Sequence, residues 1–334
     1  MVGSVAMISR VLSETLVVRD LDRAVAAWRD ELGWPVTGGG EVSPGLADLL
    51  AVSPAAHPRF ALLESPQGRV AEYAGGSLRL LEGPADDERG TFHHIGLFNA
   101  ELICADVDQL HARLTAAPDP GFRPVCPPTT YDLGAAGGAV SRSFASRGPG
   151  GAGVYFTTYQ QVPPPRVLPR LDHLVGPMMN SALAVDDRAA ERFFEDVLGL
   201  GRRFAGYFSD PNINRLLDLP PDGGFDLVVY KGEGEGLIEV DFYDRPFAAE
   251  PDPGPGRIAG GNAFLTLETA DLGGTVARAA AAGVLWQGPA ELAVEPYGGR
   301  PGLLLRGPAG QRFELVTTAG GAPRRARRPP PSPG

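Results

Sequence analysis

The chain repeats one short pattern, and that pattern limits the folds open to it. Residues 15–34 read TLVVRDLDRAVAAWRDELGW, and residues 181–200 read SALAVDDRAAERFFEDVLGL. Each stretch starts as an apolar strand, passes an aspartate (Asp20 or Asp186) into an amphipathic helix and stops at a Leu-Gly pair. Such an aspartate accepts hydrogen bonds from the first helix amides, and glycine readily adopts the left-handed conformation that ends a helix. We therefore expect a fold built from copies of one supersecondary unit.

Two fainter copies, ELICADVDQLHARL from Glu101 and LTLETADLGGTVARAAAAGV from Leu265, repeat the order strand, aspartate, helix. Each copy is followed by strand-like segments, namely SLRLLEG, GVYFTTY, LIEVDFYD and QRFELVTT. The sequence thus predicts an α+β fold of four βαβββ units.

The proline-rich residues 162–170 divide these units two and two, because proline disfavours both helix and sheet. We expect an N-terminal domain over residues 8–161, a linker over 162–170 and a C-terminal domain over 171–318. Residues 319–334 are basic and proline-rich and lack the apolar residues of a core, so a disordered tail is expected there.

Composition excludes several classes of function. The net charge of −10 argues against a general nucleic-acid binder, which needs clustered cations to neutralise phosphates. The sequence has no uncharged apolar run long enough to span a membrane and no secretion signal at its start. Two cysteines are too few for a disulfide framework. We therefore expect a cytoplasmic protein whose partner is a small-molecule substrate or ligand, and a homodimer remains open.

The four units, with DLDRAV…DELG openings and a GPAGQRFELV ending, resemble the vicinal oxygen chelate superfamily. That superfamily includes glyoxalase I, extradiol dioxygenases, bleomycin-resistance proteins and 4-hydroxyphenylpyruvate dioxygenase. The resemblance covers roughly residues 8–318 and implies two tandem half-open barrels, each formed by a pair of units around one cavity. It specifies the fold better than the reaction.

The resemblance also implies where a divalent metal would bind, because members commonly hold it on the first and last strands of paired units. Counting back seven residues from the aspartate of each unit gives the first-strand positions, which are Ser13, Asn99, Met179 and Phe264. The last-strand positions are Arg79, Tyr155, Glu239 and Glu314. Only the C-terminal half keeps carboxylates there, so the N-terminal half is expected to have lost its metal ligands.

His173 supplies a further candidate ligand, because LDHLVG resembles the iron-binding segment of 4-hydroxyphenylpyruvate dioxygenase. The second histidine of such an iron site is missing from GGNAFLTLETADLG. We predict a site of His173, Glu239 and Glu314 for Fe, Mn, Mg or Zn, with Glu314 and His173 as catalytic groups. A metal-free site is the alternative. The predicted lining residues of the C-terminal half are Ser181, Phe264, Thr266 and Glu268.

In the N-terminal half, strand alternation predicts a polar pocket containing Asn99, Glu101 and Tyr155. A histidine from FHHIGLF, His93 or His94, would give that pocket an acid–base character without metal.

The resulting expectation is a small-molecule isomerase, lyase or dioxygenase of specialised metabolism that uses a metal in the C-terminal domain. The alternatives are a metal-free binding protein, similar to the bleomycin-resistance proteins, and a metal-independent cyclase or isomerase.

Overall fold

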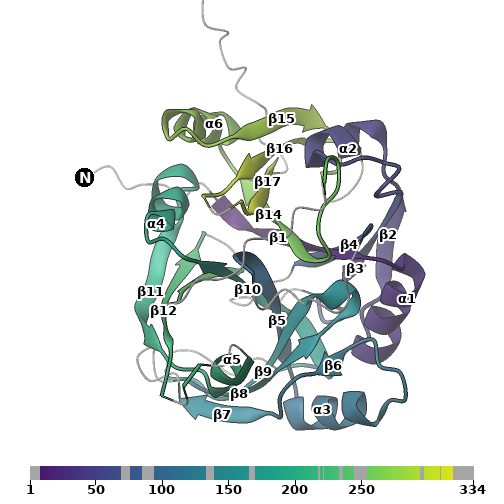
Figure 1. Ribbon diagram of the computed structural model, residues 1–334, viewed down its shortest axis with the longest axis vertical. Helices are drawn as coiled ribbons and strands as arrows, with labels where there is room; N and C mark the ends of the chain where they lie inside the picture. Colours follow the sequence, from purple (N-terminus) through teal and green to yellow (C-terminus); the bar gives the residue numbers. More distant parts are fainter. Residues whose placement is uncertain are drawn as a thin grey trace, which may run out of the picture.

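The computed structural model describes residues 8–68, 76–84, 94–132, 139–164, 170–216, 219–220, 222–232, 236–243, 254–293, 297–308 and 310–318. It has mixed α and β structure with two large sheets, as predicted (Figure 1). The predicted tail, residues 319–334, lies outside the described residues, as does His93.

Four units of one strand, a helix and further strands follow one another along the chain. Unit 1 contains β1 (Ile8–Val18), α1 (Leu21–Ala26), β2 (Val36–Glu41), α2 (Pro44–Leu50), β3 (Arg59–Glu64) and β4 (Ser77–Glu82). Unit 2 contains β5 (Gly96–Cys104), α3 (Val107–Ala116), β6 (Arg123–Pro124), β7 (Thr129–Asp132), β8 (Val140–Arg147) and β9 (Gly153–Gln161).

The second half of the chain repeats this order. Unit 3 contains β10 (Val175–Val185), α4 (Ala190–Arg192), β11 (Gly201–Phe208), α5 (Pro211–Leu216), β12 (Phe225–Lys231) and β13 (Leu237–Phe242). Unit 4 contains β14 (Gly261–Thr269), α6 (Leu272–Ala281), β15 (Trp286–Glu291), β16 (Pro301–Arg306) and β17 (Arg312–Thr317).

The predicted helix caps are present in three of the four units. The side chain of Asp20 accepts a hydrogen bond from the amide of Arg23 at 3.0 Å, and Asp106 and Asp271 cap α3 and α6 in the same way. In unit 3 the prediction was wrong by one residue, because Asp187 accepts the amide of Ala189, which precedes α4. The helices of units 1 and 3 both continue into a π-helical turn and end at a glycine with positive φ.

The pairing of the units differs from the expected two halves. Strand β1 pairs antiparallel with β14, and β10 pairs antiparallel with β5, so units 1 and 4 share one eight-stranded sheet. Units 2 and 3 share the other, nine-stranded sheet. In each unit the first strand lies at one edge, where its backbone groups need a partner strand. The order of the units along the sequence does not indicate which other first strand becomes that partner. We call the two sheets the outer-unit sheet (units 1 and 4) and the inner-unit sheet (units 2 and 3).

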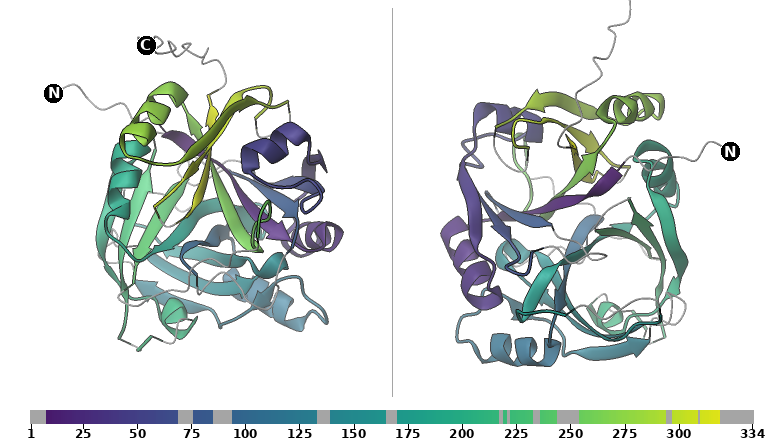
Figure 2. Two further views of the ribbon diagram at one scale, coloured as in Figure 1. Left: turned by 45° about the horizontal axis from the view of Figure 1, so that its top comes forward. Right: turned by 180° about the vertical axis from the view of Figure 1, so that it is seen from behind.

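Both sheets curve, and the views from two further directions show them side by side (Figure 2). Helices α1, α3, α4 and α6 lie on the outer side of the sheets, whereas α2 packs into the curve of the outer-unit sheet (Figure 1). A hydrophobic cluster fills the curve of the outer-unit sheet, with side chains from α2, β1, β3, β14, β16 and β17. A second and larger cluster packs the remaining helices against both sheets. The concave side of the outer-unit sheet is therefore filled with apolar side chains. This leaves the concave side of the inner-unit sheet as the place for a site.

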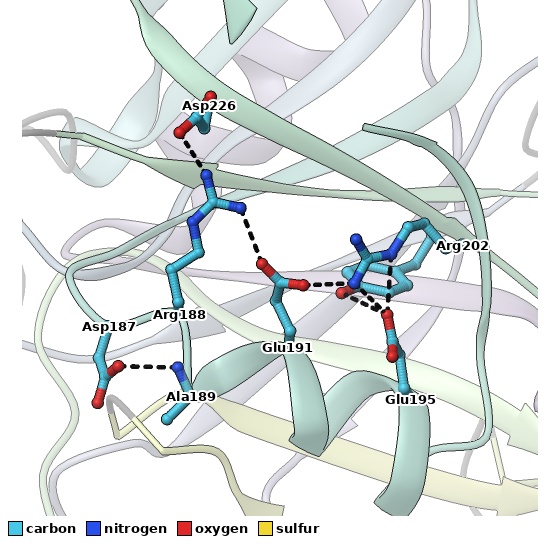
Figure 3. A network of polar contacts seen from close by, with 8 residues as sticks. Asp187, Arg188, Ala189, Glu191, Glu195, Arg202 and Asp226 are labelled. Atoms are coloured by element: carbon cyan, nitrogen blue, oxygen red, sulfur yellow. Dashed lines mark hydrogen bonds and ion pairs between the residues drawn. The ribbon is translucent and has the colours of Figure 1, made fainter. Parts of the chain in front are cut away.

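A network of charged side chains fixes the helix of unit 3 to the outer surface of the inner-unit sheet (Figure 3). Arg188 bonds to Glu191 at 2.8 Å and to Asp226 on β12. Arg202 on β11 bonds to Glu191 and, at 2.6 Å, to Glu195. These exposed pairs tie α4 to two strands of the inner-unit sheet without reaching its inner face.

Among the described residues, no helix is long and apolar enough to cross a bilayer.

Candidate functional site

A cavity of about 200 Å³ lies within the curve of the inner-unit sheet. Its wall comes from β5, β7, β8 and β9 of unit 2, from β10 to β13 of unit 3 and from α5 and the residue before it. It therefore combines residues from both halves of the chain. The polar residues of the wall are Asn99, Glu101, Tyr131, Ser141, Tyr155, Thr157, Tyr159, Asn180, Arg203, Asp210, Lys231, Glu239 and Asp241.

Four carboxyl groups line this cavity, and strand geometry explains three of them. Glu101 on β5 lies opposite Asn180 on β10, so their side chains share one face of the sheet. Glu239 and Asp241 are two residues apart on β13, which places both on the same face. The fourth, Asp210, precedes α5 and accepts hydrogen bonds from the amides of the residues that begin it.

One amide bridges two of the carboxyl groups. The Nδ2 atom of Asn180 donates to Glu239 Oε2 at 2.6 Å and to Glu101 Oε2 at 3.3 Å. The other oxygen of Glu101 accepts a hydrogen bond from Thr157 Oγ1 at 2.5 Å. Both glutamates are only partly buried and line the cavity, so the bridge holds a carboxyl pair within reach of a ligand.

Burial raises the pKa of every carboxyl in this group. The pKa of Glu101 rises to about 7, because burial outweighs the hydrogen bonds from Thr157 and Asn180 that favour its charged form. The pKa values of Glu239 and Asp241 lie well above the ordinary range, first because of burial and then through repulsion by neighbouring carboxylates. At neutral pH the glutamate pair therefore favours a state in which one carboxyl is protonated and the other is ionised.

Tyrosines complete the polar wall. The hydroxyl of Tyr155 donates to Asp210 Oδ2 at 2.5 Å, and the hydroxyl of Tyr131 lies 3.4 Å from that of Tyr155. Burial also raises the pKa of both phenols well above 10, so both remain protonated donors at neutral pH. The arrangement places phenol groups beside a carboxyl pair whose pKa values are both raised.

The corresponding place in the outer-unit sheet is closed by its own side chains. Glu314 on β17 is completely buried and accepts Arg79 Nη2 at 2.5 Å and Thr266 Oγ1 at 2.7 Å. The hydroxyl of Tyr297 also donates to it. The guanidinium carbon of Arg79 lies 5.7 Å from the ring centre of Phe264. A built-in cation and an apolar core occupy the space that a ligand would need.

The structure does not bring the three predicted metal ligands together. Glu239 lines the cavity of the inner-unit sheet, whereas Glu314 is buried in the outer-unit sheet against Arg79. His173 is exposed and precedes β10. That predicted site requires units 3 and 4 to share one barrel, whereas each of them pairs with a unit from the first half of the chain.

The residues predicted to line the C-terminal site are also dispersed. Ser181 donates its hydroxyl to Glu14 at 2.6 Å between the sheets, and Phe264 and Thr266 belong to the closed core. Glu268 forms ion pairs with Arg10 at 2.9 Å and Arg300 at 2.8 Å.

In contrast, three residues predicted for the N-terminal half, Asn99, Glu101 and Tyr155, do lie together in the cavity.

The residues at the predicted metal-ligand positions do not fit a divalent metal. In the inner-unit sheet the four predicted ligand positions hold Asn99, Tyr155, Met179 and Glu239; the outer-unit sheet holds Ser13, Arg79, Phe264 and Glu314. A guanidinium repels a cation, and thioether or phenyl groups do not bind hard metal ions. Among the residues that the structure describes, no three His, Cys, Asp or Glu side chains are placed to hold a metal ion.

Sequence reasoning missed Asn180, Asp210, Asp241 and Tyr131. The spacing of Asp241 from Glu239 in LIEVDFYD was a usable signal, because strand residues two apart share a face. Asn180 depends on which units pair, Asp210 on the position of α5 and Tyr131 on the pairing of β7 with β8. The repeat pattern encodes none of these.

Comparisons with known proteins give a consistent result. Residues 170–315 match the sequence model of the Glyoxalase/Bleomycin resistance protein/Dioxygenase superfamily. Glyoxalase I from Zea mays is similar in structure, with a TM-score of 0.59, 17% identity and 92% of each chain covered. A putative dioxygenase from Bacillus subtilis also gives a TM-score of 0.59, with 13% identity over 95% of this chain and 87% of that one. Among curated proteins, no sequence matches this chain.

Proposed function

We propose that this protein is an enzyme acting on a small molecule. The match of residues 170–315 to the model of the Glyoxalase/Bleomycin resistance protein/Dioxygenase superfamily and the fold shared with glyoxalase I support this proposal. The proposed reaction is metal-independent proton transfer, as in an isomerase or lyase, in the cavity of the inner-unit sheet. The observation that carries this proposal is the glutamate pair, Glu101 and Glu239, bridged by Asn180 at the cavity wall.

The pair has the properties of a general acid and base. A base works best when its pKa lies near the pH at which it acts, and the pKa of Glu101 is about 7. Its partner Glu239 has a pKa well above the ordinary range, so it is the group that holds a proton. Glu101 would remove a proton from a carbon acid, and Glu239 would return one to another atom of the same substrate.

Tyr131 would stabilise the negative charge that forms on a substrate oxygen in this reaction. Tyr131 and Tyr155 present phenol groups at the same cavity wall, and their raised pKa values keep the protons on them. Hydrogen-bond donors that are fixed in advance stabilise such an oxyanion without reorganisation. The hydroxyl of Tyr155 donates its only proton to Asp210 at 2.5 Å, so Tyr155 would position Tyr131 and would not itself donate to the oxyanion.

Deuterium exchange tests the proposal without knowledge of the natural substrate. Hydroxyacetone, acetoin and aminoacetone carry acidic C–H groups beside a carbonyl, and NMR in D₂O follows their exchange. We expect the protein to accelerate exchange of at least one of them, equally before and after treatment with a chelator. Glu101→Gln and Glu239→Gln should each reduce the rate by about 100-fold or more, the usual scale for loss of a general acid or base.

Glu14→Gln is the matched control, because Glu14 is also buried but lies between the sheets, bonded to Ser181 and Asn262. It should leave the exchange rate unchanged. Absence of acceleration with all three compounds, or acceleration that needs an added metal, would contradict the proposal. Binding without exchange would favour the metal-free binding protein.

A further inference from the structure

The cavity wall contains polar atoms that no described residue satisfies. Asn99 and Asn180 are 5% and 4% exposed, and the Oδ1 atom of each has no hydrogen-bond partner among the described residues. The orientation of Asn180 is fixed, because its Nδ2 atom donates to both glutamates. Ser141 Oγ, in the same wall, also has no partner in the described part of the chain. Leaving buried acceptors unpaired is costly, so the wall favours a ligand that donates hydrogen bonds.

The charged residues of the cavity wall narrow the class of ligand further. Four buried or half-buried carboxyls, Glu101, Asp210, Glu239 and Asp241, face one cavity. Repulsion from neighbouring carboxylates contributes to the raised pKa values of Glu101, Glu239 and Asp241. Two cations, Arg203 and Lys231, also line it, and neither forms an ion pair with a described residue. Arg203 is exposed and Lys231 is partly exposed, so both lie in a better-solvated part of the wall than Asp241. The inner part therefore has an excess of carboxyl groups, which a bound cation would keep ionised.

A row of aromatic rings borders the acidic part. Tyr131 and Phe208 have ring centres 5.9 Å apart, as do Phe208 and Phe225, and Phe225 lies 4.8 Å from Tyr243. The hydroxyl of Tyr243 donates to Asp241 at 3.0 Å. Aromatic faces attract organic cations through the ring quadrupole, in addition to packing against their apolar parts. Acidic and aromatic groups thus lie next to one another in and around the cavity wall.

From these observations we propose that the ligand is a compact organic cation with N–H donors, such as a primary ammonium or amidinium compound carrying a small apolar group. The N–H groups would satisfy the orphaned amide oxygens, the positive charge would offset the carboxyls, and the apolar part would lie against the aromatic row. The cavity of about 200 Å³ is smaller than the ~300–1,000 Å³ typical of drug-sized ligands, which favours a small molecule. The inference rests on the proposed function only in placing the ligand in this cavity.

Matched probes separate the parts of this proposal. Benzylamine and benzamidine carry charge and N–H donors, benzyl alcohol is the neutral analogue, and benzyltrimethylammonium has the charge without the donors. Binding to the full chain is measured by titration calorimetry at pH 7.5. We expect at least one of the two donor cations to bind 10-fold or more tightly than both benzyl alcohol and benzyltrimethylammonium.

Variants then locate the binding site. Glu239→Gln and Asp241→Asn should each weaken binding of the better donor cation by 10-fold or more, and Glu14→Gln should leave it unchanged. Thermal unfolding of each variant without ligand shows that it is folded. Equal binding of the alcohol, binding unaffected by both cavity variants, no binding of either donor cation, or stabilisation by Mg²⁺ or Mn²⁺ alone would each overturn the inference.

The two proposals can fail separately. If the amines bind as described but no carbon acid exchanges, proton transfer is wrong and the ligand class stands. If neutral hydroxyacetone exchanges and no amine binds, the enzyme proposal stands and the ligand class is wrong.

Discussion

The two curved sheets are built from equivalent units, yet the glutamate on the last strand has different surroundings in each of them. In the outer-unit sheet, Glu314 is neutralised by Arg79 and further bonded by Thr266 and Tyr297. In the inner-unit sheet, Glu239 is bonded by the amide of Asn180 and lies at a cavity. Arg79 makes Glu314 part of the core, whereas Glu239 forms no ion pair with a cation in the described part of the chain and is left to be compensated by a proton or a ligand.

The largest expected effect concerns the pairing of the units. Because β1 pairs with β14 and β5 with β10, each half of the chain carries two first strands whose partners lie in the other half. Residues 1–164 and 170–334, produced separately, should not form stable folded monomers. Size-exclusion chromatography and thermal unfolding by circular dichroism measure this. Two cooperative, monomeric halves would show that the sheets do not depend on each other's units.

The buried ion pair of the outer-unit sheet provides the next comparison. Arg79→Met leaves Glu314 without its cation in a fully buried position and should destabilise the protein by about 3–5 kcal/mol in urea unfolding. Replacing both residues by Met should recover most of that loss, since no buried charge then remains. In contrast, Glu239→Gln should not destabilise by more than about 1 kcal/mol. A larger loss there would mean that the inner-unit carboxyls are structural as well.

Glu14, between the two sheets, gives a pH-dependent test. Burial raises its pKa from 4.5 to about 7 in the folded protein. A carboxyl with a raised folded pKa binds its proton more tightly when folded. Its contribution to stability is therefore greatest below pH 4.5, declines between pH 4.5 and about 7, and stays low above that.

Glu14→Gln removes the cost of the buried charge. The variant should be more stable than the wild type by about 1–3 kcal/mol at pH 8 and equally stable near pH 4.5, measured by urea unfolding at both values. A constant difference across this range would show that Glu14 does not titrate as described.

The smallest effect is expected at the surface network of unit 3. Arg188 is half exposed and pairs with Glu191 and Asp226 on the outer side of the wall (Figure 3). Arg188→Gln should change the free energy of unfolding by less than about 1 kcal/mol, because exposed ion pairs contribute little. It should leave ligand binding in the cavity unchanged, and altered binding would indicate that the outer face shapes the inner one.

The repeat pattern was sufficient to predict the fold and the superfamily resemblance. Local signals such as the cap at Asp20 and the strand LIEVDFYD lie within single units, where short-range physics decides the structure. The site was harder, because it depends on which units pair. Asn99, Glu101 and Tyr155 were placed by alternation within unit 2, whereas the partner of Glu239 could be found only once β5 and β10 were seen to be neighbours.

The most direct measurement is a pH titration of the glutamate carboxyl carbons by ¹³C NMR on protein labelled at the glutamate side chain. We expect two glutamates other than Glu14 to titrate well above their ordinary range, Glu101 with an apparent pKa of about 7, and we expect their signals to be lost in Glu101→Gln and Glu239→Gln. The signal of Glu14 is identified by its loss in Glu14→Gln. Titration of both cavity glutamates near their ordinary pKa of 4.5 would contradict the acid–base pair on which the proposed function depends.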